Sequence, residues 1–225
     1  MCIRDSPNIA LLPALQAAGY EIAYVGSYEG IEKKLIADFN IPYTGISTGK
    51  FRRYLDPKNF SDPFRVMKGF VEARNYLKNY QPDVVFSKGG FVSVPVVRAA
   101  ASLHIPCIIH ESDMTPGLAN KLCIPVAEKV CCNFPETMKN IPADKAVLTG
   151  SPIRAELAQG SRLAGLNMCG FTANKPVIMV IGGSLGAANV NKAVRDALPK
   201  LLEDFQVVHL CGKDKIDNLL LNTPG

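Results

Sequence analysis

The chain has 225 residues, of which 48% are hydrophobic, so it can bury the core of one large domain or two small ones. No apolar run approaches the roughly 20 residues that a membrane-spanning helix needs, and the first six residues lack the apolar core of a secretory signal. The seven cysteines show no metal-ligand spacing, which favours reduced core residues in a cytosolic protein.

The net charge of +5 is concentrated in one segment. Residues 50–80 contain eight Lys and Arg against three Asp and Glu, a balance of +5, and the rest of the chain is neutral. A local basic surface is therefore expected, without the overall basic character of many nucleic-acid-binding proteins.

Apolar runs of strand length alternate with longer stretches of helical period, which is typical of βα units around a parallel sheet. The pattern predicts helices over 7–18, 29–38, 63–80, 93–103 and 187–202. It predicts strands over 21–25, 83–86, 106–110, 129–132, 146–148, 177–181 and 206–210. The predicted fold class is α/β, with doubly wound parallel sheets.

The predicted elements form two series. We expect an amino-terminal α/β domain over residues 1–155, a polar, glycine-bearing linker over 156–172 and a second α/β domain over 173–225. The first series opens in a helix instead of a strand and glycine-rich turn, and the second stops after two strands. The first strand and loop are thus expected to be missing and the second domain truncated, with marginal order at its open sheet edge.

Each series contains a glycine turn between a strand and a helix. Gly89 and Gly90 let backbone amides approach a ligand at a helix N-terminus, which suits an anion such as diphosphate, although a bare tight turn fits equally well. Gly182, Gly183 and Gly186 surround Ser184, which favours nucleotide phosphate binding over a bare turn. Neither turn matches the dinucleotide or P-loop fingerprints.

Further polar residues follow predicted strands. His110, Glu111, Asp113 and Asn120 lie in or beyond the end of strand 106–110, where open α/β sheets bind ligands. The alternative is that they cap the following helix and hold its turn. Arg154 follows strand 146–148, and its planar guanidinium could bind a carbonyl or phosphate, or form only a surface salt bridge.

The predicted helix 63–80 combines an apolar face with basic residues. Val66, Phe70, Ala73 and Leu77 share one face at helical spacing. Phe60 and Phe64 accompany basic residues, a combination that favours docking on an anionic membrane over nucleic acid. A core-facing helix with a solvated basic side is the alternative.

Four motifs occur together in this chain: Ser87–Pro95, His110-Glu111 followed by Gly117–Lys121, Gly150–Arg154 and Gly182–Ala187. In this order and spacing they resemble the undecaprenyl-diphospho-muramoylpentapeptide N-acetylglucosaminyltransferase family, the MurG enzymes, from about Pro7 to the last residue. The resemblance implies a GT-B fold of two doubly wound domains. It also implies transfer of N-acetylglucosamine from UDP-N-acetylglucosamine to lipid I (undecaprenyl-diphospho-N-acetylmuramoyl-pentapeptide), giving lipid II with inversion and without a metal or cofactor.

The resemblance also implies site residues. The UDP-N-acetylglucosamine site would include Arg154, Ser184, Gly183, Asn120, Asp113 and Glu111, although Asp113 stands where many members carry Asn. The acceptor diphosphate would lie at Gly89 and Gly90. Docking on the anionic inner leaflet, as a peripheral protein on the cytoplasmic side of the bacterial cell membrane, would involve Phe60, Phe64, Arg65, Met67, Lys68 and Phe70.

The chain also departs from the family pattern. Members open with a G-G-T-x-G-H-x-x-P loop whose histidine is the general base, and only its proline, Pro7, has a counterpart here. No catalytic residue is therefore assigned, and we expect the 225-residue chain to be inactive alone. Two other functions stay open: a UDP-N-acetylglucosamine 2-epimerase or other GT-B transferase, and a non-catalytic lipid-docking module.

Overall fold

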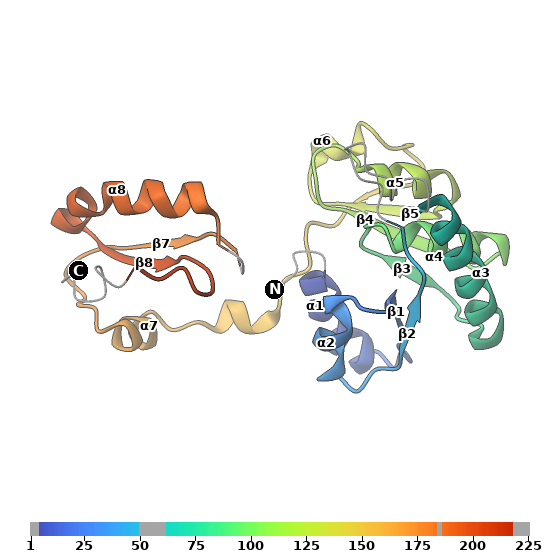
Figure 1. The fold of residues 1–225 in the computed structure, drawn as a ribbon, viewed down its shortest axis with the longest axis horizontal. Coiled ribbons are helices and arrows are strands. Elements are labelled where there is room, and N and C mark those ends of the chain that lie inside the picture. The colour runs from blue at the N-terminus through green and yellow to red at the C-terminus, as the bar shows by residue number, and fades with distance from the viewer. Residues whose placement is uncertain (1–4, 50–61, 184–185, 218–225) are drawn as a thin grey trace. The chain divides into compact units, whose positions relative to one another are not determined.

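The computed structural model describes residues 5–49, 62–183 and 186–217. The chain divides into a larger compact unit over 2–154 and a smaller one over 155–225 (Figure 1). Every strand pair in the described residues is parallel, as the alternation of strands and helices predicted. The α/β class is thus confirmed.

The larger unit opens with a two-stranded sheet and two helices. These elements are α1 (Asp5–Ala17), β1 (Tyr24–Ser27), α2 (Ile31–Ala37) and β2 (Tyr43–Ile46). Leu12, Ile36 and Ile41 are buried together between them. The sequence pattern did not predict β2, and it put the first strand at 21–25. Both strands take their limits from pairing, because Tyr24 lies opposite Tyr43 and Ser27 opposite Ile46.

The second sheet of this unit has four strands in the order β3-β4-β5-β6. The strands are β3 (Val85–Ser87), β4 (Cys107–Glu111), β5 (Lys129–Cys132) and β6 (Ala146–Leu148). The helices that follow them are α4 (Ser93–Ser102), α5 (Leu118–Cys123) with the short 3-10 helix η2 (Ile124–Val126), and α6 (Pro135–Met138). Val97 of α4, Ile109 of β4 and Val130 of β5 are fully buried in one core cluster. This cluster packs α4 against the sheet.

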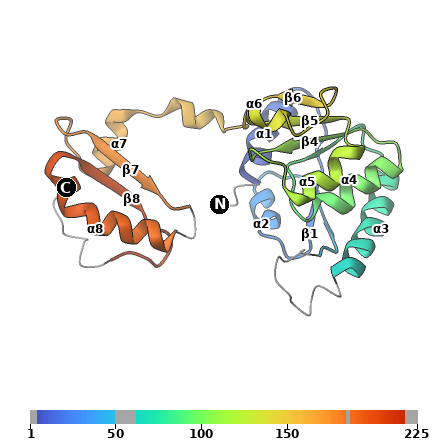
Figure 2. The same cartoon turned by 90° about the horizontal axis from the view of Figure 1, so that it is seen from above.

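Helix α3 (Asp62–Tyr80) lies beside α4 (Figures 1 and 2). Ala73 and Leu77 are buried, as the helical spacing predicted. A Cβ atom on Gly69 would lie 2.0 Å from the Ser47 carbonyl oxygen, so glycine allows the helix to pack this closely. The Glu72 carboxylate accepts hydrogen bonds from the Ser47 backbone and hydroxyl, at 2.6 and 3.1 Å. These contacts anchor α3 beyond the end of β2.

The smaller unit contains η3 (Ala155–Gln159), α7 (Arg162–Cys169), β7 (Val177–Ile181), α8 (Ala188–Asp204) and β8 (Gln206–Leu210). The limits of β7 and β8 are those that the sequence predicted. The segment expected as a linker contains α7, whose ends carry recognisable caps. The Ser161 hydroxyl accepts from the Ala164 amide, and Gly170 ends the helix at φ +66°.

Two general features complete the description. No helix in the described ranges is long and apolar enough to cross a membrane. Cys107, Cys123 and Cys132 are buried as free thiols, and burial raises the pKa of both Cys107 and Cys123 to about 11. These buried cysteines are therefore core residues of low thiolate character.

Candidate functional site

The carboxyl edge of the four-stranded sheet gathers most of the predicted polar residues. Parallel strands end at a common edge, and the loops after β3, β4 and β6 begin there. Gly89 follows β3, and Glu111 is the last residue of β4. Asn120 belongs to α5, the helix that follows the loop after β4. The structure brings these three residues together.

The first glycine turn is shaped by its neighbours. Gly89 and Gly90 have φ of +83° and +98°, a region that L side chains rarely adopt. A Cβ on Gly89 would lie 3.0 Å from the Asn120 Oδ1 atom. The Gly90 carbonyl accepts a hydrogen bond of 2.6 Å from the Ser93 hydroxyl. Helix α4 begins here without a side-chain cap, so its N-terminus is suited to an anionic ligand.

Glu111 holds the loop after β4. One carboxylate oxygen accepts from the Ser112 and Asp113 amides at 2.8 and 3.0 Å. The other accepts from the Gly117 amide at 3.0 Å and from the Asn120 Nδ2 atom at 2.8 Å. A carboxylate has about four acceptor positions. A direct contact between Glu111 and a ligand would displace one of these bonds, so the geometry favours the loop-holding role that the sequence left open.

Unlike Glu111, Asn120 and Asp113 each have side-chain oxygen atoms that could contact a ligand. Asn120 is 5% exposed, and its Nδ2 atom donates to the His110 carbonyl and to Glu111. Its Oδ1 atom is buried and accepts from no described residue. A buried acceptor without a partner is suited to a donor group on a ligand. The side chain of Asp113 is exposed, while its backbone carbonyl accepts from the Thr137 hydroxyl.

Lys88 is a member of this edge that the sequence analysis did not single out. It is 7% exposed, and its Nζ atom lies 2.6 Å from His110 Nδ1. A lysine before a glycine turn normally suggests a solvated side chain, so no local signal indicates this burial. No group of three or more His, Cys, Asp or Glu among the described residues is arranged to hold a metal ion.

The second glycine turn lies between β7 and α8. Gly183 and Gly186 have φ of +76° and +67°, and a Cβ on Gly186 would lie 1.8 Å from the Cys211 carbonyl oxygen. Helix α8 also begins without a side-chain cap. Ser184 lies outside the described residues. Arg154 is exposed and ends the larger unit.

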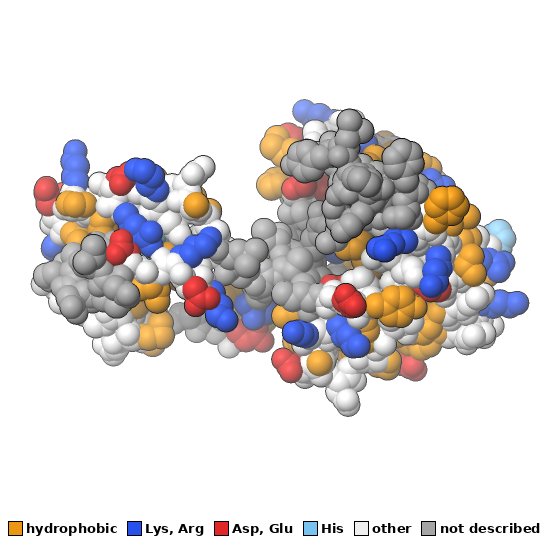
Figure 3. Space-filling model, viewed as in Figure 1, with side chains coloured by type: hydrophobic (Ala, Val, Ile, Leu, Met, Phe, Trp, Pro, Cys, Tyr) orange, Lys and Arg blue, Asp and Glu red, His pale blue; other side chains and the backbone are white. Residues whose placement is uncertain are grey.

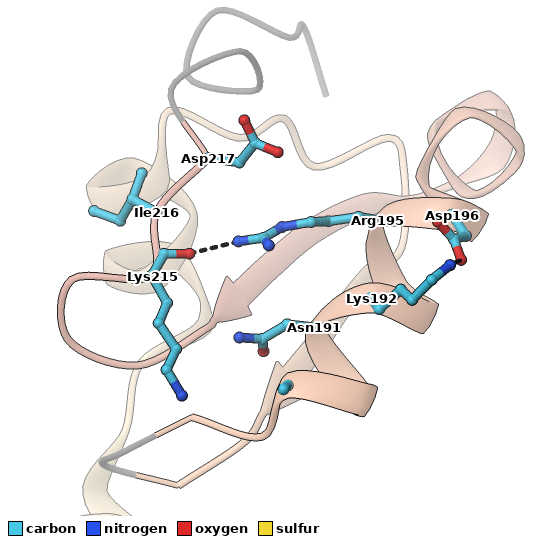
Figure 4. Close-up of a pocket in the computed structure, with 8 residues that line it drawn as sticks. Asn191, Lys192, Arg195, Asp196, Lys215, Ile216 and Asp217 are labelled. Carbon is cyan, nitrogen blue, oxygen red and sulfur yellow. Dashed lines mark hydrogen bonds and ion pairs between the residues drawn. The ribbon is translucent and has the colours of Figure 1, made fainter.

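A hollow of about 770 Å³ lies beside α8 in the smaller unit (Figure 4). Its cationic side chains are engaged by neighbours: Lys192 pairs with Asp196, Arg195 donates to the Lys215 carbonyl, and Lys215 Nζ donates to the Gly186 carbonyl. None of the residues predicted to bind a ligand lines this hollow. It therefore does not define the site.

An exposed apolar stripe runs along α3. Phe64, Met67 and Val71 are 78%, 63% and 52% exposed, at helical spacings of three and four. Arg65 and Lys68 are exposed beside them, and hydrophobic and basic side chains intermingle over this region in Figure 3. We call Phe64, Met67 and Val71 the α3 stripe.

Of the six predicted docking residues, Phe64 and Met67 belong to this stripe, and Arg65 and Lys68 lie beside it. Phe70 packs against the core cluster, because it shares the buried face of the helix with Ala73 and Leu77. Its docking role therefore stays a prediction, whereas the next residue, Val71, is exposed. Phe60 lies outside the described residues.

The comparisons with known proteins agree with the motifs. Residues 6–132 match the glycosyltransferase family 28 N-terminal domain, and residues 177–222 match the glycosyltransferase family 28 C-terminal domain. The chain is 66% identical over 220 residues to the UDP-N-acetylglucosamine–N-acetylmuramyl-(pentapeptide) pyrophosphoryl-undecaprenol N-acetylglucosamine transferase of Lachnospira eligens. That match covers 98% of this chain and 62% of the relative, so the chain spans about three fifths of the length of such relatives.

Solved structures give the same assignment. The crystal structure of Acinetobacter baumannii MurG matches with a TM-score of 0.68 and 29% identity, over 95% of this chain and 57% of that one. The UDP-N-acetylglucosamine 2-epimerase of Neisseria meningitidis matches with a TM-score of 0.59 over 91% of this chain and 63% of that one, but at 14% identity it shares the fold alone. The GT-B class is thus confirmed, and the chain belongs to glycosyltransferase family 28, with the MurG enzymes as its relatives.

Proposed function

We propose that this chain forms the acceptor-binding domain and the beginning of the donor-binding domain of an inverting transferase. The enzyme moves N-acetylglucosamine from UDP-N-acetylglucosamine to lipid I and so produces lipid II. The observation that carries the proposal is the 66% identity to transferases of this name over nearly the whole chain. The sheet edge around Gly89, Glu111 and Asn120 supplies the chemistry for it.

The acceptor diphosphate is proposed to bind at the first glycine turn. Gly89 and Gly90 place no Cβ atoms of their own at the start of α4, and the uncapped helix N-terminus attracts negative charge. Asn120 is proposed to accept a hydrogen bond from a sugar hydroxyl or amide through its unpartnered Oδ1 atom. Glu111 acts indirectly, because it orders the loop that carries Asp113.

The donor diphosphate is proposed to bind at the second glycine turn, with Gly183, Ser184 and Arg154. In the reaction, the C4 hydroxyl of the muramoyl sugar attacks the anomeric carbon while the bond to UDP breaks. The electron pair of that bond leaves with the diphosphate, and the hydroxyl proton passes to a base. Backbone N–H groups and the Arg154 guanidinium would stabilise the charge that develops on the leaving group.

A chimera tests this function directly. The aligned 220 residues of the Lachnospira eligens transferase are replaced by this chain, and transfer of labelled N-acetylglucosamine to lipid I is measured. We expect lipid II to form. In the same chimera, Arg154→Ala should weaken UDP-N-acetylglucosamine binding roughly 10- to 100-fold, because a charge-assisted hydrogen bond contributes about 1.5–3 kcal/mol.

The control and the rival outcomes are distinct. Arg162→Ala, which removes an exposed arginine on α7, should leave binding unchanged. A well-folded chimera that makes no lipid II would contradict the transferase proposal. Conversion of the donor without lipid I would indicate an epimerase instead.

Membrane docking through the α3 stripe is the second part of the proposal. Phe64 and Met67 offer apolar area to the lipid, and Arg65 and Lys68 offer charge to an anionic headgroup layer. Co-sedimentation with vesicles that contain phosphatidylglycerol tests it. Phe64→Ser with Met67→Ser should lower binding by roughly tenfold or more. Met168→Ser, at an 84% exposed position on α7, is the matched control. Equal binding of all three proteins would exclude this docking surface.

A further inference from the structure

Lys88 and His110 form a buried pair at the carboxyl edge of the larger unit. Lys88 is 7% exposed and His110 is 2% exposed. The Lys88 Nζ atom lies 2.6 Å from His110 Nδ1 and 2.5 Å from the Ser112 hydroxyl oxygen. The other ring nitrogen, Nε2, lies 2.9 Å from the Gly150 carbonyl oxygen. One imidazole thus joins the end of β3 to the segment that follows β6.

Donor and acceptor chemistry allows one form of this ring. A lysine ammonium only donates hydrogen bonds, so His110 Nδ1 must accept and carries no proton. A carbonyl oxygen only accepts, so Nε2 must carry the proton that it donates to Gly150. Both contacts select the same neutral tautomer, with the proton on Nε2.

The carbonyl that His110 contacts belongs to the turn after β6. Gly150 has φ of +69°, and the Thr149 and Gly150 amides both donate to the Cys132 carbonyl, at 3.0 and 3.1 Å. Beyond this point the backbone runs to Arg154 at the end of the unit. The Gly150 carbonyl accepts from His110 Nε2 at 2.9 Å and from the neighbouring Thr149 hydroxyl at 3.1 Å. Of these two bonds, the one from His110 ties the start of the Gly150–Arg154 segment to another strand, β4.

We propose that Lys88 is a positioning residue that keeps His110 in the Nε2-protonated neutral form, so that His110 holds the backbone at Gly150 and with it the segment that ends in Arg154. We call this chain of contacts, from Lys88 through His110 to the Gly150 carbonyl, the relay. Its geometry does not depend on the proposed function. Its consequence for the reaction rests on the proposed donor contact of Arg154.

The surrounding charges are compatible with this relay. Burial lowers the pKa of Lys88 to about 8, against the opposing charges of Glu111 and Asp113, so the ammonium form persists at neutral pH. Burial and the Lys88 charge lower the pKa of His110, against the Gly150 hydrogen bond and Glu111. The Cys131 thiol also faces the pair, and burial raises its pKa, so it stays neutral. A neutral ring beside a charged lysine is the combination that the relay requires.

Nitrogen NMR of the 225-residue chain with ¹⁵N-labelled histidine tests the tautomer. The chain has three histidines, so His104→Gln and His209→Gln variants assign the remaining ring. We expect the wild-type His110 ring to be neutral and protonated on Nε2 at pH 7, and to titrate below the ordinary histidine range. A wild-type ring protonated on Nδ1 would overturn the proposal without any variant of Lys88.

Lys88→Met tests the positioning role. Loss of the neighbouring charge should move the titration of His110 upward, and loss of the donor should let the Nδ1-protonated form appear. The Thr149 and Gly150 amides should then exchange with solvent about fivefold to tenfold faster, as expected when one hydrogen bond is weakened. Ser112→Ala removes the other partner of Lys88 and should leave the His110 tautomer unchanged. The amide of Ile109, in the middle of β4, reports any global destabilisation.

Two results from Lys88→Met would also overturn the proposal, and a result from the chimera separates it from the proposed function. An unchanged His110 titration in Lys88→Met would show that Lys88 does not set the ring. If the tautomer and titration of His110 change but the Thr149 and Gly150 amides exchange at the same rate, His110 does not position the backbone there. If the relay passes both measurements but Arg154→Ala leaves UDP-N-acetylglucosamine binding unaffected in the chimera, the donor role of Arg154 fails while the relay holds.

Discussion

The two glycine turns look alike in sequence but are stabilised in different ways. The first turn, at Gly89 and Gly90, is surrounded by side chains: Asn120 limits the space beside Gly89, and Ser93 bonds to Gly90. The second turn is limited by backbone, because the Cys211 carbonyl oxygen occupies the space where Gly186 would carry a Cβ. A side chain can move by rotation and a backbone carbonyl in a strand-to-loop junction cannot. We therefore expect the second turn to tolerate substitution less well.

Gly186→Ala should produce the largest effect. Its Cβ would lie 1.8 Å from the Cys211 carbonyl oxygen, and the residue would also keep a φ of +67°. We expect a loss of roughly 3 kcal/mol or more in the free energy of local opening. Hydrogen exchange of the β7 and β8 amides measures it. Gly183→Ala, at φ +76° with no atom within 4 Å of the added Cβ, is the matched control for strain alone. Equal effects at the two glycines would contradict the role of the carbonyl.

Glu111→Gln should be the next largest and should affect only the larger unit. The amide group of glutamine replaces one acceptor oxygen with a donor, which would face N–H groups of the loop. We expect the chain to lose about 2–3 kcal/mol in the unfolding free energy of this unit, since hydrogen bonds to charged groups are involved. Urea unfolding measures the loss, with Glu128→Gln at an exposed position as the control. A loss no larger than that of the control would exclude Glu111 as the organiser of the loop.

Gly89→Ala should be milder than Gly186→Ala. The added Cβ would lie 3.0 Å from the Asn120 side chain, which can shift, although the φ of +83° still strains an alanine. A loss of about 1–2 kcal/mol is expected in the unfolding free energy. The double variant Gly89→Ala with Asn120→Ala separates the two causes, because removal of the Asn120 amide leaves only the backbone strain. A Gly89→Ala effect as large as that of Gly186→Ala would remove the distinction between the two turns.

The last expected effect is a gradual one, a pH dependence of stability that comes from Lys88. Burial lowers the pKa of Lys88 from its ordinary 10.5 to about 8. Between these values the unfolded chain binds more protons than the folded chain, so the contribution of Lys88 to stability rises with pH. The unfolding free energy of wild type should therefore rise relative to that of Lys88→Met from pH 8 to 10.5, by at most about 1.4 kcal/mol per pH unit. Parallel stability curves would contradict a buried, titrating Lys88.

Local patterns account for much of what was predicted. The strands at 129–132, 146–148, 177–181 and 206–210 have the predicted limits. Short apolar runs bounded by polar residues or proline leave little choice of limits. Strand β2 escaped prediction because its four residues include Gly45 and show no clear alternation. Its extent is set by pairing with β1, which no local pattern contains.

In the candidate site, too, some features follow from local sequence patterns and others depend on contacts between distant segments. The glycine turns and the polar loop after β4 could be located from sequence, because glycines and polar residues after a buried strand indicate a turn, whether or not that turn binds a ligand. The roles of individual residues could not be read in this way. Glu111 uses its acceptor positions within its own loop, and Phe70 packs in part against the core cluster.

By itself the sequence determined the class of fold, the order of most elements and the family, since these depend on residue type and spacing along the chain. Only the tertiary structure decided that Lys88 is buried against His110, that His110 reaches Gly150, and that Gly186 must lack a side chain. Each of these contacts joins residues more than twenty positions apart. Such contacts arise when parallel strands bring distant loops to one edge of a sheet, and short-range periodicity carries no record of which loops will meet.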